Sequence, residues 1–164
     1  MYFQKFPRIV YEYDIKGKGV LKTVVDITRN VRFQKELLSN ITLYDLYDIK
    51  DGETPEMLSD RIYGSSQYHW VIMLANDRYD YIRDWPMSSD VLNNYILSNY
   101  TTEQLGDTHH WEKDGYIVES DILDASPVSN WEHEVRQNDL KRRIKIINPV
   151  LLKQILQEFN NLTV

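Results

Sequence analysis

Four histidines are the residues of this chain that could hold a metal ion: His69, His109, His110 and His133. Histidine nitrogens are common zinc ligands. His109 and His110 are adjacent, so in a strand their side chains would point to opposite faces. The sequence has no His-x-x-x-His spacing, which would place two ligands on one helix face. We therefore predict no metal site and no cofactor, and we expect each histidine to be packed or to face solvent.

Carboxylates are the second set of groups that could do chemistry, and Asp77, Asp80 and Asp84 follow one another closely. Their hard oxygen ligands would suit calcium, but the stretch lacks the glycine and the final glutamate of an EF-hand loop. A glycosidase needs two carboxylates that face a sugar cleft, and no spacing singles out such a pair. There is no glycine-rich phosphate-binding loop, no marked nucleophile and no cysteine. These patterns therefore single out no catalytic residue and suggest no reaction.

The basic cluster Lys141-Arg142-Arg143, with Lys145, could meet nucleic acid or a nuclear-import receptor. However, the chain has 19 Lys and Arg against 25 Asp and Glu, a formal net charge of −6. A general nucleic-acid binder would have a strong basic excess. We therefore expect these residues to be solvated charges on an edge strand or Arg contacts in a protein interface, and we expect no nucleic-acid partner.

An aromatic set could bind sugar, because sugars stack on exposed rings; its members are Tyr68, Trp70, Tyr79, Tyr81 and Trp85. The alternative is that Trp70 and the apolar residues after it are core, since a helix that is apolar all round is usually buried. Large aromatic and Arg side chains also dominate the energies of protein interfaces. Our predicted interface residues are Tyr68, His69, Trp70, Arg78, Trp85, Arg142 and Arg143.

The stretch 43–86 must position most of these side chains. Its first part alternates like a strand and ends at a turn, Asp51-Gly52. Thr54 is then a helix N-cap, with a proline at the first helical position, and Gly64 is placed to end that helix. A second helix is predicted over 68–75. The local order is therefore strand, turn, helix, tight turn, helix.

The flanking segments have periodicities of their own. They predict a β-hairpin at 8–27, a short helix or an extended arm at 29–39, a helix after Ser88 or Ser89, a small hairpin at 111–119, a loop at 120–130, a short helix over about 131–140, a strand at 143–146 and a final helix after Asn148-Pro149. We divide the chain into an N-terminal arm (1–39), a central domain with its following helix (40–100) and a C-terminal extension (101–164).

Residues 47–76 resemble a LysM-type module. The resemblance lies in Tyr47-x-Ile49-x-x-Gly52-x-Thr54, followed by Leu58-x-x-x-Ile62-Tyr63-Gly64 and Leu74-x-Asn76. LysM modules are small βααβ units that usually bind N-acetylglucosamine polymers. The resemblance implies a LysM-like βαα(β) core. Together with the periodicities of the flanking segments, it predicts an α+β fold with an N-terminal β-hairpin arm and a C-terminal extension of hairpin, strand and helix. A capped helical hairpin with no ligand is the alternative.

Nearly the whole chain, in order, resembles the LysM-like baseplate wedge subunit family of contractile-tailed bacteriophages. Four stretches carry the match: Y-F-Q-K-F-P near the start, Y-G-S-S-Q-Y-H-W-V-I-M-L-A-N with the later D-W-P, H-H-W-E, and S-N-W-E-H-E-V-R-Q-N-D-L-K-R-R-I-K-I-I-N-P. The resemblance implies a structural virion protein of the tail baseplate that is not an enzyme. It also implies assembly in the host bacterial cytoplasm and a role in joining neighbouring wedges around the hub in a six-fold assembly. The implied partners are other baseplate wedge proteins, including the tail-sheath initiator.

A second interpretation is a peptidoglycan-binding LysM module of a tail-associated cell-wall protein. No signal peptide is visible, and the longest apolar run, Trp70–Ala75, is far shorter than the roughly 18 residues of a membrane helix. We therefore expect no membrane partner. The segments look too short for one compact core, and such arms often order only on a partner. We expect residues 1–39 and 101–164 to contact neighbouring subunits.

Overall fold

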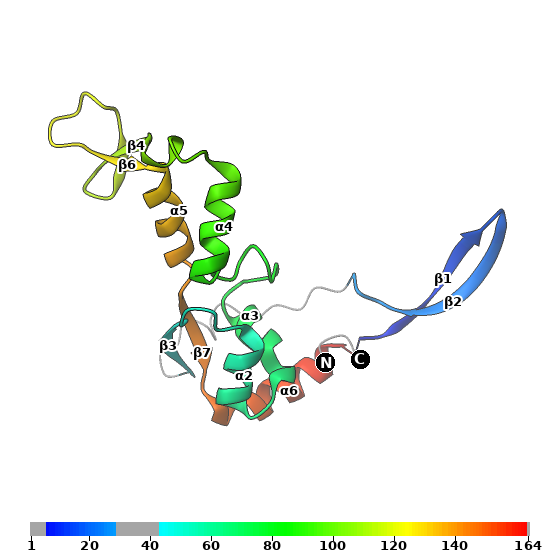
Figure 1. Ribbon diagram of the computed structural model, residues 1–164. Coiled ribbons are helices and arrows are strands. Elements are labelled where there is room, and N and C mark those ends of the chain that lie inside the picture. Colours follow the sequence, from blue (N-terminus) through cyan, green and yellow to red (C-terminus); the bar gives the residue numbers. More distant parts are fainter. Residues whose placement is uncertain (1–5, 29–42, 164) are drawn as a thin grey trace. The chain divides into compact units, whose positions relative to one another are not determined.

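The computed structural model describes residues 6–28 and 43–163 and has an α+β fold of helices and small antiparallel sheets (Figure 1), which confirms the predicted fold class. The chain forms two compact units, each made of separate segments. Unit 1 takes its described residues from Met1–Leu46, Thr54–Tyr79 and Lys145–Val164, and unit 2 from Tyr47–Glu53 and Asp80–Ile144. The division at residues 39 and 100 remains a prediction about domains. The choice between helix and arm at 29–39 lies outside the described residues.

The N-terminal strands β1 (Arg8–Ile15) and β2 (Lys18–Val25) form an antiparallel two-stranded ribbon. Lys16 and Gly17 make the turn with φ angles of 54° and 80°. Two successive positive φ angles are typical of a type I′ turn, whose twist matches that of the strands. The Asp14 carboxylate accepts a hydrogen bond from Gly17 N at 2.7 Å. The structure thus confirms the predicted hairpin.

The next part of the chain follows the predicted order of strand and two helices. The elements are β3 (Tyr44–Asp48), α2 (Pro55–Tyr63), the 3₁₀ turn η3 (Ser66–Tyr68) and α3 (His69–Ala75). At the start of α2, Thr54 Oγ1 accepts a hydrogen bond from Met57 N at 3.3 Å. At its end, Gly64 has a φ angle of 72° and donates its N–H to Asp60 O at 2.9 Å. Both caps of α2 are therefore confirmed.

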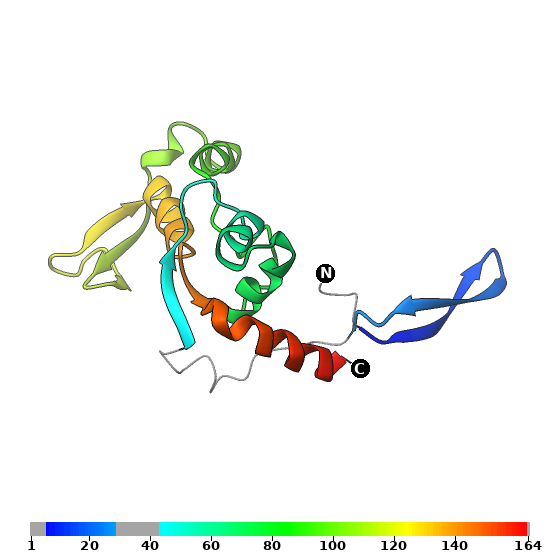
Figure 2. The ribbon, with the colours of Figure 1, turned by 90° about the horizontal axis from the view of Figure 1, so that it is seen from below.

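The strand that pairs with β3 is β7 (Arg143–Ile147), which comes much later in the chain (Figure 2). Asn148 N donates to Leu43 O at 3.0 Å, and Ile49 N donates to Arg142 O at 2.9 Å, so the strands run antiparallel. The order is therefore strand, helix, helix, strand, with residues 76–142 between α3 and β7. The strand at 143–146 was predicted, but its pairing with β3 was not.

Asn76 joins the end of α3 to β7 within unit 1. Its amide nitrogen donates to Lys145 O at 2.7 Å and to Ile72 O at 2.8 Å. Its amide oxygen accepts a hydrogen bond from Lys145 N at 2.7 Å. One side chain thus satisfies both backbone groups of a β7 residue and a carbonyl near the end of a helix. These contacts give a physical reason for asparagine at the predicted helix stop.

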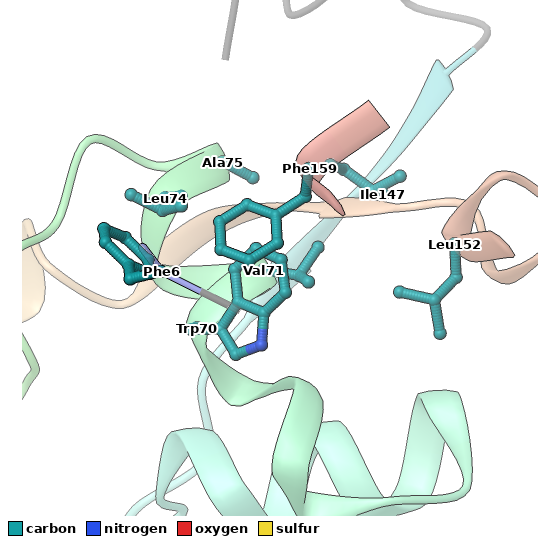
Figure 3. Packing of buried hydrophobic residues seen from close by; sticks show 8 residues of the cluster. All are labelled: Phe6, Trp70, Val71, Leu74, Ala75, Ile147, Leu152 and Phe159. Carbon is teal, nitrogen blue, oxygen red and sulfur yellow. The ribbon is translucent and has the colours of Figure 1, made fainter. Parts of the chain in front are cut away.

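The hydrophobic core of unit 1 gathers around α3 and the final helix, α6 (Pro149–Thr163). Its buried residues are Phe6, Trp70, Val71, Leu74, Ala75, Ile147, Leu152 and Phe159 (Figure 3). The ring centroids of Trp70 and Phe159 lie 4.5 Å apart, and those of Phe6 and Phe159 lie 6.0 Å apart. Three aromatic rings from distant parts of the sequence therefore hold the N-terminal segment, α3 and α6 together.

Unit 2 contains helices and a three-stranded sheet. Its elements are α4 (Ser89–Asn99), the 3₁₀ turn η4 (Gln104–Gly106), β4 (Thr108–Lys113), β5 (Tyr116–Val118), β6 (Ser126–Ser129) and α5 (Asn130–Asp139). The sheet has the order β5-β4-β6, and Asp114-Gly115 turns between β4 and β5. The hairpin at 111–119 and both helices are confirmed. The prediction of a loop over all of 120–130 was wrong for β6, where Pro127 is tolerated because the strand lies at the sheet edge.

In the described parts of the chain, no helix combines the length and the apolar composition that crossing a membrane requires.

Candidate functional site

The predicted interface residues of unit 1 gather around the start of α3. Trp70 is 8% exposed and lies in the core, and Tyr68 is half-buried against the same cluster. His69 is half-buried, and its Nδ1 lies 2.9 Å from the Ser66 carbonyl oxygen, so Nδ1 donates in this contact. Trp70 thus packs inside unit 1, as the core alternative expects. An interface role for these three residues remains a prediction.

Arg78 and Trp85 follow α3 and belong to different units. Arg78 is half-buried, and its backbone N–H donates to Met73 O at 2.9 Å just after the end of α3. Trp85 is 6% exposed, and its indole N–H donates to the Glu53 carbonyl oxygen at 2.8 Å within unit 2. Because Trp70 and Trp85 are both buried, neither indole offers a free face on which a sugar ring could stack.

Arg142 joins the end of α5 to residues 49–51 within unit 2. Its Nε donates to Asp139 Oδ1 at 2.9 Å, and its Nη1 donates to Ile49 O at 3.2 Å. Its Nη2 lies 3.4 Å from Asp51 Oδ1, which also accepts a hydrogen bond from Ser89 N at 2.9 Å. Burial raises the pKa of Asp51, but the hydrogen bonds from Ser89 and Arg142 outweigh it and the pKa lies below its ordinary value. The Arg142 side chain is therefore engaged inside unit 2.

Of the other residues of the basic cluster, Lys141 makes a hydrogen bond within unit 2 and Arg143 lies at the surface. Lys141 Nζ donates to the Arg83 carbonyl oxygen at 2.7 Å. Arg143 is exposed and lines an open depression of about 670 Å³, whose other walls come from β4, the β4–β5 turn, β5 and α5. Of the predicted pair Arg142 and Arg143, Arg143 is thus the one with an exposed side chain.

The ribbon formed by β1 and β2 has one largely apolar face. Residues that lie opposite each other in an antiparallel pair point to the same side. The pairs Ile9–Val24 and Tyr13–Val20 therefore share a face with Tyr11 and its partner Lys22. Their exposed fractions are 42% for Ile9, 55% for Tyr11, 52% for Tyr13, 38% for Val20 and 37% for Val24. We call these five residues the ribbon face.

A second exposed apolar group lies in unit 2 at the β4–β5 hairpin and the loop after it. Tyr116 and Ile117 of β5 are each 74% exposed, and Leu123 is 80% exposed. Tyr116 and Ile117 are consecutive in β5, so their side chains point to opposite faces of the sheet. These residues fall in the C-terminal extension, for which contacts with neighbouring subunits are predicted.

The three aspartates considered for calcium serve local turns. Asp80 Oδ1 accepts hydrogen bonds from Ile82 N at 2.9 Å and Arg83 N at 3.0 Å, and Asp84 Oδ2 accepts one from Asp80 N at 2.8 Å. Asp77 Oδ1 accepts one from the Tyr79 hydroxyl at 3.2 Å. Within the described residues, they do not form a group of carboxylates with the spacing of a metal site.

The histidines of β4 do not point to opposite faces as predicted, because the strand contains a bulge. Thr108 lies opposite Ser129 and His110 lies opposite Val128, so His109 is an extra residue on β4. A bulge breaks the alternation of side chains and re-aims them. The Nδ1 atoms of His109 and His110 lie 2.9 Å apart, so one donates a hydrogen bond to the other.

His133 of α5 completes a cluster with these two residues. Its ring stacks on His109, with centroids 3.7 Å apart and planes 9° apart, and meets His110 edge-on at 5.6 Å. One nitrogen from each of the three rings lies within 4.8 Å of the others. Burial, followed by the neighbouring His109, lowers the pKa of His133, and Glu134 opposes the shift. The sequence predicts none of this, because neither the bulge nor the β4–α5 contact has a local signature.

Comparison with known proteins places the chain in a family. Residues 1–121 match the family described as base plate wedge protein 53. Baseplate wedge protein gp53 of Enterobacteria phage T4 is 33% identical to the chain over 78 residues. That match covers 47% of this chain and 39% of the phage T4 protein, so it spans well under half of the relative's length. The chain therefore belongs to the base plate wedge protein 53 family, as its resemblance to phage baseplate wedge subunits implied.

Proposed function

We propose that this protein is a structural component of a phage tail baseplate wedge and joins neighbouring wedges around the hub by protein–protein contacts. Membership of the base plate wedge protein 53 family supports the location, and the name of the phage T4 relative agrees with it. The protein would reside in the virion after assembly in the host bacterial cytoplasm. It would act without catalysis and would contact neither nucleic acid nor a membrane.

The ribbon face is the observation that carries the proposal. A two-stranded hairpin is at best marginally stable alone in water, yet this one exposes five large apolar side chains on a single face. Aromatic residues such as Tyr11 and Tyr13 are frequent anchors of protein interfaces. Among the residues that the structure describes, no third strand pairs with this two-stranded sheet, so another chain can extend either edge by adding a strand. A partner subunit would therefore bury the ribbon face and, at the same time, form backbone hydrogen bonds with one strand edge.

The other predicted interface residues lie outside the ribbon, in the rest of unit 1 and in unit 2. We propose that the unit formed by β3, α2, α3 and β7 is LysM-like and serves as a protein-binding module. Tyr68, His69 and Arg78 of unit 1 are half-buried and Arg143 of unit 2 is exposed, so part of each residue is accessible to a partner. Trp70, Trp85 and Arg142 would support these surfaces from inside each unit. The partners would be other wedge proteins, including the tail-sheath initiator, in a six-fold assembly.

The test is reconstitution of the wedge with variants of the ribbon face and, separately, of the opposite side of the same ribbon. The double variant Tyr11→Ser/Tyr13→Ser removes two aromatic anchors from the ribbon face. A hot-spot residue contributes about 2 kcal/mol or more, so we expect binding to the co-expressed wedge proteins of the same phage to weaken at least about thirtyfold. Size-exclusion chromatography and native mass spectrometry of the assembled wedge provide the measurement.

The matched control changes the opposite side of the same ribbon. Val10 and Leu21 are 68% and 69% exposed and point away from the ribbon face. Val10→Ser/Leu21→Ser should therefore assemble like the unmodified protein. Equal assembly by both double variants would contradict the proposal. Saturable binding of the unmodified protein to insoluble peptidoglycan, without wedge assembly, would favour the cell-wall interpretation instead.

A further inference from the structure

The histidine cluster is held in place by the backbone of unit 2. Asn130 N donates to Asp107 O at 3.0 Å, and the Asn130 side-chain amide donates to Gln104 O at 2.8 Å. Ser129 Oγ accepts a hydrogen bond from Glu132 N at 3.2 Å and caps α5. The start of α5 is therefore fixed against the start of β4. His133, one turn into α5, is carried to the side on which the bulge presents His109 and His110.

The donor set of this cluster suits a transition-metal ion. We propose that His109, His110 and His133 bind one divalent transition-metal ion of the zinc type through three imidazole nitrogens. Two nitrogens that are each about 2.0–2.1 Å from a tetrahedral ion lie roughly 3.4 Å apart. The Nδ1 atoms of His109 and His110 would move apart by roughly half an ångström from their 2.9 Å separation. Because an imidazole binds an ion in its ring plane, the stacked rings of His109 and His133 would also turn out of parallel so that their nitrogens, which lie within 4.8 Å, converge on the ion.

The surroundings favour this ion class over calcium or magnesium, which prefer oxygen ligands. The nearby carboxylates of Glu112 and Glu132 are paired with the Arg136 guanidinium. His110 and His133 line the open depression next to Arg143, so water can reach the fourth coordination position. The bound ion would tie β4 to α5. If the stacked imidazole rings served only to stabilise unit 2, the protein would bind no metal ion there.

The test uses the full chain without a histidine tag, with Co²⁺ as a spectroscopic probe and Zn²⁺ as a competitor. Titration of Co²⁺ should give visible absorption typical of a tetrahedral site, saturating at about one ion per chain and bleached by Zn²⁺. The single variants His109→Gln, His110→Gln and His133→Gln should each weaken Zn²⁺ binding by more than about tenfold. Even the loss of a residue that only hydrogen-bonds to a metal ligand lowers metal affinity about 10–100-fold.

The fourth histidine of the chain provides the matched control. His69 lies in unit 1, outside the cluster, so the Zn²⁺ affinity of His69→Gln should stay within about twofold of that of the unmodified protein. Circular dichroism in EDTA checks that each variant folds, and loss of folding in one single variant leaves the other two as independent tests. The inference is overturned by absence of saturable Co²⁺ or Zn²⁺ binding, or by binding that survives replacement of all three clustered histidines. Neither result affects wedge assembly, which has its own test.

Discussion

Replacing Trp85 separates an interior role from an interface role for this residue. The side chain is 6% exposed, and its indole N–H donates to Glu53 O at 2.8 Å within unit 2. Truncation of a buried tryptophan to alanine costs about 3–5 kcal/mol, since both the transfer energy and a cavity contribute. Trp85→Phe keeps most of the ring but leaves the Glu53 carbonyl oxygen without this donor, which costs about 1–3 kcal/mol.

Urea denaturation followed by far-UV circular dichroism measures both changes. Trp85→Ala should shift the unfolding equilibrium of unit 2 by more than about hundredfold, because every 1.4 kcal/mol is about tenfold. Trp131 is the matched control, since it also lies in unit 2 but is 38% exposed. Trp131→Ala should cost clearly less than Trp85→Ala. A Trp85→Ala protein of unchanged stability that fails to assemble would refute the interior role and restore the predicted interface role.

Three further predictions concern stability. Asn138 is 3% exposed and exchanges two hydrogen bonds with the Met87 backbone, at 2.7 and 3.1 Å, so Asn138→Ala should cost about 1–3 kcal/mol in urea denaturation; an effect near zero would contradict these contacts. Gly64→Ala should lower stability by about 1 kcal/mol, because the φ angle of 72° disfavours a Cβ; a rise in the melting temperature would contradict the left-handed cap. The lowered pKa of His133 means that the folded state resists its protonation, so this residue's contribution to stability falls as pH drops below the unfolded value of about 6.5. His133→Gln should flatten the stability profile between about pH 7.5 and 5 in EDTA, and an unchanged profile would count against the shift.

The local elements of this fold could be predicted because they have local causes. Thr54, Pro55 and Gly64 specify both ends of α2 by capping and backbone geometry. Lys16-Gly17 and Asp114-Gly115 specify tight hairpin turns. Alternating and helical periodicities then gave β1, β2, α4 and α6. Each of these signals is contained within a few residues, so no knowledge of the rest of the chain was needed.

The long-range features could not be predicted in this way. The pairing of β3 with β7 joins strands separated by two helices and residues 76–142, and no local pattern encodes a partner at that distance. Strict alternation predicts that His109 and His110 point to opposite faces of β4, and the bulge at His109 breaks this alternation. The bulge can be recognised only when the pairing of β4 with β6 is known. Residues such as Trp70 and Trp85 have the types expected of an interface, but their burial depends on segments distant in sequence.

Site-specific photo-cross-linking from the ribbon face tests the central claim most directly. A photo-reactive amino acid placed at Tyr11, on the ribbon face, and at Leu21, on the opposite face, compares two exposed positions of one ribbon in assembled wedges. We predict cross-links from position 11 to another baseplate wedge protein, and far fewer from position 21. Fully assembled wedges without any cross-link from position 11 to another subunit would contradict the proposal that this ribbon joins the protein to its neighbours.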